Sequence, residues 1–150
     1  MDISHRSTDP REWKDGLPVK RLMIVDANPA MRQILVDILE SFFSIEGILS
    51  TGGAALREAS RLNPDIILLD VSLGDMSGFS VAERLQKSGC EAKIVFVSGH
   101  ESVSFIDTAR RLGASGYIFK SQIDRDLMNV LRSVSRGGQF VSSVPHESNH

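Results

Sequence analysis

The sequence predicts an α/β domain built as a doubly wound sheet of five parallel strands with five helices. Two observations lead to this prediction. Five short apolar runs recur along the chain, and the stretches between them carry apolar residues at helical spacing. Strands that alternate with helices through short loops form right-handed crossovers and therefore a parallel sheet. With 150 residues, 41% of them hydrophobic and 24% charged, the chain has the size and composition of one globular domain.

The five expected strands are short and rich in Val, Ile, Leu and Phe. They cover residues 22–25, 45–49, 66–69, 94–97 and 117–119. The third and fourth runs are apolar at every position. Such runs are typical of strands that are buried on both faces of a parallel sheet.

Each expected helix carries one apolar stripe, which indicates a packing face rather than a ligand site. Asn28 suits the N-cap of the first helix and Pro29 its first position, ahead of a stripe over residues 31–42. The second stripe, over residues 55–62, is followed by Asn63-Pro64, which ends a helix because the residue before a proline disfavours helical backbone. The remaining stripes cover residues 79–85, 103–109 and 123–134, and each is followed by glycine, at Gly89, Gly113 and Gly137-Gly138.

The ends of the chain and its charge limit the possible functions. We expect residues 1–19 to be a flexible lead-in, residues 20–142 to form the domain and residues 143–150 to be a flexible tail. Seventeen Lys and Arg against nineteen Asp and Glu give a net charge of −2, so there is no basic surface that predicts direct binding to nucleic acid. The single Cys90 excludes an internal disulfide and favours the cytoplasm. No apolar stretch predicts a membrane span or a secretory signal.

Four polar residues follow the apolar runs at the end of the sheet where ligands bind in such folds. They are Asp26, Asp70, Ser98 and Lys120, after the first, third, fourth and fifth runs. Paired carboxylates bind a hard cation such as Mg²⁺, and a lysine is a compact charge for a phosphate. Taken singly, each residue is also a common strand cap or surface residue. Together they favour phosphoryl transfer, with Asp70 as a carboxylate nucleophile.

Other phosphate and nucleophile chemistries fit the sequence less well. The turn after the first strand reads VDANPAM, which is neither the glycine pattern of a dinucleotide site nor the Ser/Thr/Gly-rich loop of a flavodoxin. No histidine falls at a strand end, which argues against a Ser-His-Asp site. A hydrolase of the haloacid dehalogenase type would have a second Asp two residues after the nucleophile, where this chain has Ser72.

Four segments of the chain resemble the receiver domain of bacterial two-component response regulators, of the NarL/FixJ branch. They are MIVDANPAMR, PDIILLDVSLGDMSGF, IVFVSGH and GASGYIFK, and the resemblance extends over about residues 20–142. It implies a flavodoxin-like fold with strand order 2-1-3-4-5. It also implies a signalling switch with weak intrinsic phosphotransfer and autodephosphorylation, rather than a metabolic enzyme.

The resemblance assigns a role to each candidate residue. Asp70 is the expected phosphoacceptor, with Ser98 and Lys120 as the residues that contact the phosphoryl group. Asp26, Asp70 and the backbone carbonyl of Ser72 are the expected Mg²⁺ ligands. Ser98 and Tyr117 form the expected switch, which carries the signal to the surface of the fourth helix, fifth strand and fifth helix; the alternative for Tyr117 is a packed strand residue with its hydroxyl at the surface. Ser72 and His100 occupy positions that influence how fast the phosphoryl group is lost.

The sequence departs from the family pattern at three positions. Ala27 replaces the second of two adjacent acids, which predicts weaker Mg²⁺ binding. Asn28 either compensates through its amide oxygen or serves as the helix cap. Gly74 and Ser121 replace prolines, and Gly74 adds freedom to its loop.

Two functional hypotheses remain from the sequence. The first is a receiver that is phosphorylated by a sensor histidine kinase or a phosphotransfer protein, that acts on a downstream protein, and that is able to form a homodimer. The second is a divergent pseudo-receiver that binds partners without phosphorylation, which the absence of an acid at Ala27 supports. Because the chain stops at His150, about where the linker to an output domain would begin, we expect a stand-alone receiver; a fragment of a longer regulator is the alternative.

Overall fold

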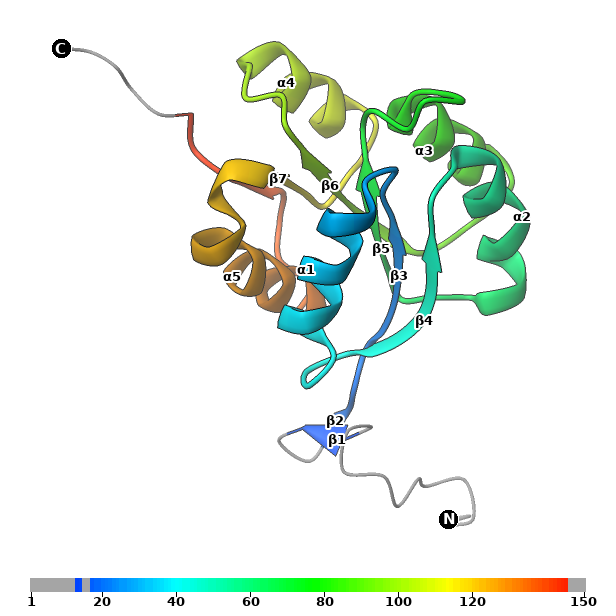
Figure 1. The fold of residues 1–150 in the computed structure, drawn as a ribbon, viewed down its shortest axis with the longest axis vertical. Coiled ribbons are helices and arrows are strands. Elements are labelled where there is room, and N and C mark those ends of the chain that lie inside the picture. Colours follow the sequence, from blue (N-terminus) through cyan, green and yellow to red (C-terminus); the bar gives the residue numbers. More distant parts are fainter. Residues whose placement is uncertain (1–12, 15–16, 146–150) are drawn as a thin grey trace, which may run out of the picture.

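The computed structural model describes residues 13–14 and 17–145 of the chain. Figure 1 shows a central sheet with helices packed on both of its faces. The sheet strands are β3 (Arg21–Val25), β4 (Ser44–Leu49), β5 (Ile66–Asp70), β6 (Lys93–Ser98), β7 (Gly116–Phe119) and β8 (Val141–Ser142). The helices are α1 (Pro29–Leu39), α2 (Gly52–Leu62), α3 (Gly78–Lys87), α4 (Val103–Arg111) and α5 (Ile123–Ser135), with a short 3-10 turn, η3 (Lys120–Gln122), before α5.

The sheet confirms the predicted parallel order and corrects the predicted number of strands. Its order is β4-β3-β5-β6-β7-β8, and all neighbours are parallel. The first five strands therefore follow the expected order 2-1-3-4-5, but the sheet has six strands rather than five. The sixth strand, β8, lies after Gly137-Gly138. Because it is only two residues long, it is too short to show an alternating pattern of apolar and polar residues in the sequence. It pairs with the edge of β7, which would otherwise be unpaired.

Two apolar layers position the strands. One layer joins one face of the sheet to α2, α3 and α4, and the other joins the opposite face to α1 and α5. Successive residues of a strand enter opposite layers: Met23 and Val25 face the first, and Leu22 and Ile24 the second. All five residues of β5 are buried, as the apolar run predicts.

The predicted helix caps and ends are found at the expected residues, except that α1 ends at Leu39, whereas its apolar stripe extends to residue 42. Asn28 caps α1, and its side chain accepts from the amides of Ala30 (2.8 Å) and Met31 (3.1 Å). Left-handed backbone ends helices at Asn63 (φ 47°) and at Gly89, Gly113 and Gly137 (φ 88°, 82° and 79°). Because the amide oxygen of Asn28 is engaged in capping, its role here is that of the cap.

The two ends of the domain lie partly outside the described residues. Of the expected lead-in, residues 1–12 and 15–16 lie outside them, and β1 (Trp13–Lys14) pairs with β2 (Leu17–Pro18) in antiparallel fashion. Of the expected tail, residues 146–150 lie outside them. Ser143, the first residue of that expected tail, is only 2% exposed and packs onto the sheet.

Among the described residues, no helix has both the length and the apolar character that crossing a membrane requires.

Candidate phosphoacceptor site

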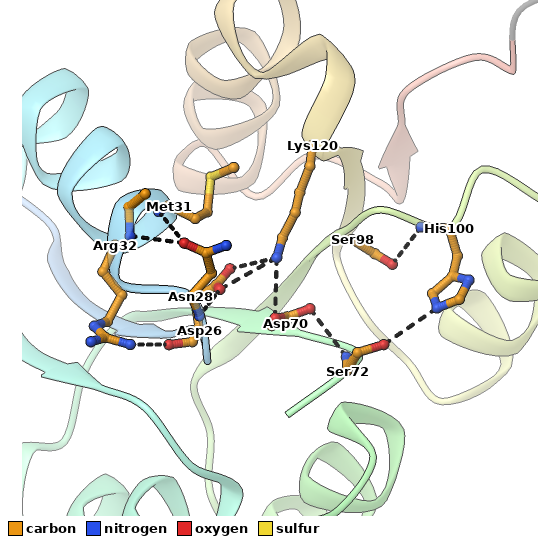
Figure 2. A network of polar contacts seen from close by, with 10 residues as sticks. Asp26, Asn28, Met31, Arg32, Asp70, Ser72, Ser98, His100 and Lys120 are labelled. Atoms are coloured by element: carbon orange, nitrogen blue, oxygen red, sulfur yellow. Dashed lines mark hydrogen bonds and ion pairs between the residues drawn. The ribbon is translucent and has the colours of Figure 1, made fainter. Parts of the chain in front are cut away.

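Three acidic or hydroxyl side chains and one lysine meet at the carboxyl ends of four neighbouring strands. Asp26 follows β3, Asp70 ends β5, Ser98 ends β6 and Lys120 follows β7. Asp26, Asp70 and Ser98 are 1%, 4% and 0% exposed. Figure 2 shows the Lys120 side chain extending from the start of η3 toward the two aspartates. The convergence predicted from the strand ends is therefore present.

The Lys120 ammonium bridges the two carboxylates. Its Nζ lies 3.0 Å from Oδ2 of Asp26 and 3.1 Å from Oδ2 of Asp70. It donates a hydrogen bond to Oδ1 of Asp26 (3.3 Å) and to Oδ2 of Asp70 (3.1 Å). Two buried carboxylates thus share one ammonium, and the group carries an excess negative charge when both are ionised.

The pKa of Asp70 is raised above its ordinary value, mainly because burial disfavours the charged carboxylate. The backbone N–H of Ser72, which donates to Oδ1 of Asp70 at 3.1 Å, acts in the opposite direction. The negative charge of Asp26 raises the pKa further, and the Lys120 ammonium lowers it. Any added cation would therefore favour the ionised, nucleophilic form of Asp70.

The site offers fewer oxygen ligands than the family pattern, but the ligands that are present are chemically suitable for Mg²⁺. Oδ2 of Asp26 is buried and accepts no directed hydrogen bond from the described residues, although it is ion-paired with Lys120. Ala27 is exposed and contributes no side-chain ligand. Among the described residues, no three or more acids, histidines or cysteines are grouped so that their side chains could hold a metal ion. Two carboxylates and a backbone carbonyl fit Mg²⁺, which usually keeps several waters.

Arg32 of α1 holds the backbone at the edge of this acidic pair. Its Nη1 donates to the carbonyl of Asp26 at 2.7 Å (Figure 2). The backbone N–H of Asn28 donates to Oδ1 of Asp26 at 2.9 Å. Asp26 is therefore fixed at both its carbonyl and its carboxylate by residues at the start of α1.

Ser98 and Tyr117 are connected through the backbone of His100. The N–H of His100 donates to Oγ of Ser98 at 3.0 Å, and the hydroxyl of Tyr117 donates to the carbonyl of His100 at 2.7 Å. The Tyr117 side chain is fully buried, and burial raises its pKa. Its hydroxyl is thus satisfied inside the domain, and the alternative of a surface hydroxyl is wrong.

The loops around Asp70 are joined by side-chain contacts that the sequence did not predict. Oγ of Ser72 lies 3.3 Å from Nε2 of His100, whose ring stacks on Phe105 at 4.3 Å between centroids. Glu101, which follows His100 in the β6–α4 loop, accepts a hydrogen bond at Oε2 from the hydroxyl of Ser121 at 2.6 Å. The β6–α4 loop is therefore tied to the loop after β5 and to the start of η3.

Two further residues shape the loop that follows Asp70. Both carboxylate oxygens of Asp75 accept backbone N–H groups at the start of α2, from Gly52 and Gly53 at 2.9 Å each, and these bonds lower the pKa of Asp75. A Cβ on Gly78 would lie 2.1 Å from the carbonyl oxygen of Asp70. For Asp75 and Gly78, the only signal in the sequence was their place in the segment GDMSGF, because the groups that they contact lie outside this segment.

The chain was compared with known proteins. The family model for the response regulator receiver domain matches residues 22–132. The transcriptional regulatory protein MctR of Rhizobium johnstonii is 29% identical over 84% of this chain and 60% of its own length. The nitrate/nitrite response regulator NarP of Escherichia coli is 30% identical over 81% of this chain and 58% of its own length. The chain thus spans about three fifths of the length of these regulators.

The fold is shared with solved structures as well. A CheY-like response regulator receiver domain protein from Methanospirillum hungatei is 28% identical over 79% of this chain and 95% of its own, with a TM-score of 0.72.

Proposed function

The chain belongs to the response regulator receiver domain family, and on this premise we propose that Asp70 accepts a phosphoryl group from a phosphohistidine of a sensor kinase or phosphotransfer protein. The observation that carries the proposal is the placement of the Asp70 carboxylate, 3.1 Å from the Lys120 ammonium and beside Asp26 at one end of the sheet. The family membership does not favour the alternative of a phosphorylation-independent module.

The proposed step is a displacement at phosphorus. A carboxylate oxygen of Asp70 forms a new O–P bond while the P–N bond of the phosphohistidine breaks, and the imidazole nitrogen leaves with the electron pair of that bond. No general base is required, because the nucleophile is already an anion. Positioning and charge neutralisation supply the catalysis in this chemistry. Lys120 would turn from neutralising Asp70 to neutralising the transferred group.

Receiver domains generally depend on Mg²⁺, and we propose the same for this chain. Asp26, Asp70 and the backbone carbonyl of Ser72 would hold the ion, which would supply positive charge opposite the phosphoryl oxygens. Because Ala27 contributes no carboxylate, we expect the affinity to be weaker than in a site with one more acid. Among this chain's own groups, Lys120 is then the main source of charge neutralisation.

Phosphorylation would act as a switch through Ser98 and Tyr117. The hydroxyl of Ser98, which now accepts from the N–H of His100, would turn to donate to a phosphoryl oxygen. Tyr117, bonded to the carbonyl of that same His100, would respond and alter the surface formed by α4, β7 and α5. We propose that this surface binds a downstream protein or a second copy of the chain.

We propose that the exposed pair of Ser72 and His100 influences the lifetime of the phosphoryl group. Oγ of Ser72 lies 3.3 Å from Nε2 of His100, and the backbone N–H of Ser72 donates to Oδ1 of Asp70 (Figure 2). They would control which water molecules approach the phosphorus atom. We propose that the protein acts in the cytoplasm, where its single cysteine would remain reduced.

The proposal is tested by labelling with acetyl phosphate and Mg²⁺, followed by intact mass measurement. We expect one phosphoryl adduct on the wild type and none on Asp70→Asn. Asp65→Asn is the matched control, because Asp65 immediately precedes β5, at the opposite end from Asp70, and is exposed. The proposal fails if the wild type gives no adduct at high Mg²⁺, or if Asp70→Asn is labelled as well as Asp65→Asn.

A further inference from the structure

The segment over residues 138–143, here named the C-terminal strap, crosses the surface formed by α4, β7 and α5. Its strand β8 pairs with β7, where the N–H of Val141 donates to the carbonyl of Ser115 at 3.1 Å and the N–H of Ser143 donates to that of Tyr117 at 2.8 Å. The strap therefore covers the edge of the strand that carries Tyr117.

Ser143 holds the strap at its far end. Its Oγ accepts from the N–H of Phe119 at 3.0 Å and donates to Oδ2 of Asp126 on α5 at 2.7 Å. With 2% exposure, it is as buried as a core residue. This hydroxyl therefore binds a strand amide and a helix carboxylate at the same time and fixes the strap to both elements.

Phe140 joins the strap to α4. The guanidinium of Arg110, in the last turn of α4, lies 4.9 Å from the centroid of the Phe140 ring. Phe140 is partly buried against the apolar layer that contains Tyr117. The strap thus contacts α4 through Arg110, β7 through Tyr117 and Phe119, and α5 through Asp126.

Hydrogen bonds that are joined through the backbone of His100 and through Tyr117 link the strap to Ser98 of the phosphoacceptor site. Oγ of Ser98 accepts from the N–H of His100 (3.0 Å), the carbonyl of His100 accepts from the hydroxyl of Tyr117 (2.7 Å), and the carbonyl of Tyr117 accepts from the N–H of Ser143 (2.8 Å). If Ser98 turns toward a phosphoryl group, the N–H of His100 loses its acceptor. The loop that positions both Tyr117 and the start of α4 then shifts.

We infer that the C-terminal strap is an autoinhibitory contact: it occupies the α4–β7–α5 surface in the unmodified protein and is released when Asp70 is phosphorylated. This inference rests on the proposed function. It assigns the strap a regulatory role toward the same site. Because coupling between two sites is reciprocal, a variant that loosens the strap must also favour the phosphorylated state.

The first test measures amide hydrogen exchange by NMR in the full chain. The amides of Phe119, Val141 and Ser143 report the strap, since each donates across it. With acetyl phosphate and Mg²⁺ we expect their exchange to accelerate at least about fivefold, the lower end of typical allosteric couplings. The amides of Ile66, Ile67 and Leu68, in the part of β5 away from Asp70, should not change.

The second test uses two pairs of variants. Ser143→Ala removes both Oγ contacts, with the neighbouring Ser142→Ala as control, and Arg110→Ala removes the contact with Phe140, with Arg111→Ala as control. Arg110→Ala leaves the β7 edge intact and therefore remains informative if Ser143→Ala impairs folding. We expect Ser143→Ala and Arg110→Ala, but not their controls, to reach a higher phosphorylated fraction at limiting acetyl phosphate.

The outcomes separate the inference from the function on which it rests. An adduct on Asp70 with unchanged exchange at Phe119, Val141 and Ser143 overturns the inference and leaves the proposed function standing. Loosened variants with an unchanged phosphorylated fraction overturn it too. If no adduct forms on the wild type, the proposed function fails and the inference fails with it.

Discussion

Replacing Gly78 by alanine should strain the backbone that presents Asp70. Gly78 is the first residue of α3, and its N–H donates to the carbonyl of Val71 at 2.7 Å. An added Cβ would lie 2.1 Å from the carbonyl oxygen of Asp70 and 2.9 Å from Cα of Val71. Both obstacles are backbone atoms, which cannot turn away as a side chain would.

The size of the effect follows from that geometry. Ordinary van der Waals contact begins near 3.4 Å, so the two segments must separate by about 1.3 Å. Overpacking of this kind costs about 1–3 kcal/mol, and we expect the upper end because backbone must move on both sides. The gain of a helix from Gly→Ala, up to about 1 kcal/mol, offsets part of that cost. The net expectation is a loss of about 2 kcal/mol.

Urea unfolding measures this loss, with Gly53→Ala as the matched control. Gly53 also lies in the first turn of a helix, but the nearest obstacle to its Cβ is the flexible guanidinium of Arg57 at 3.3 Å. The control should therefore be neutral or stabilised by about 0.5 kcal/mol. Labelling of Asp70 should slow about a hundredfold in Gly78→Ala, since a displacement near 1 Å is enough for that. Equal stability of the two variants would refute the reasoning.

Three further expectations concern charge. Asp70→Asn should stabilise the fold at neutral pH by about 1–2 kcal/mol, because Lys120 then pairs with one buried carboxylate instead of two. Because the pKa of Asp70 is raised in the folded protein, the stabilising effect of Asp70→Asn is present at pH values above the carboxyl titration range and disappears as the pH falls and Asp70 of the wild type becomes protonated. Thermal unfolding at several pH values measures this effect, and a variant that remains more stable than the wild type in acid would contradict the expectation. Ala27→Asp should lower the Mg²⁺ concentration at which half the protein is labelled; an unchanged midpoint would show that position 27 does not face the ion. Asp75→Ala should accelerate amide exchange at the two glycines that begin α2, and because the pKa of Asp75 is lowered, the wild type should lose the same protection as the pH falls through that pKa.

The elements that the sequence predicted are those encoded by local patterns. A buried parallel strand such as β5 shows itself as an unbroken apolar run, and a capped helix such as α1 shows Asn-Pro ahead of its stripe. The convergence of Asp26, Asp70, Ser98 and Lys120 could be predicted for the same reason. Once the strands are parallel, the residues at their carboxyl ends must share one edge of the sheet.

The features that escaped prediction depend on contacts between distant segments. β8 has two residues and is formed by pairing with the edge of β7, which lies more than 20 residues earlier in the chain. The Asp75 carboxylate satisfies amides that are 22 and 23 residues away, and Ser72 meets His100 across 28 residues. Gly78 is required by the approach of the Asp70 backbone, and no local preference reveals such an approach.

The absence of a carboxylate at position 27 has opposite consequences with and without a cation. A third acid would add repulsion to two buried carboxylates that already share one ammonium, so it would destabilise the metal-free fold. The same acid would strengthen Mg²⁺ binding by supplying another hard ligand. With Ala27, the Lys120 ammonium faces two carboxylates rather than three, so the fold depends less on a cation for its stability. The phosphoryl transfer step is expected to be less favourable, because the Mg²⁺ ion that helps to neutralise the phosphoryl charge is held by one ligand fewer.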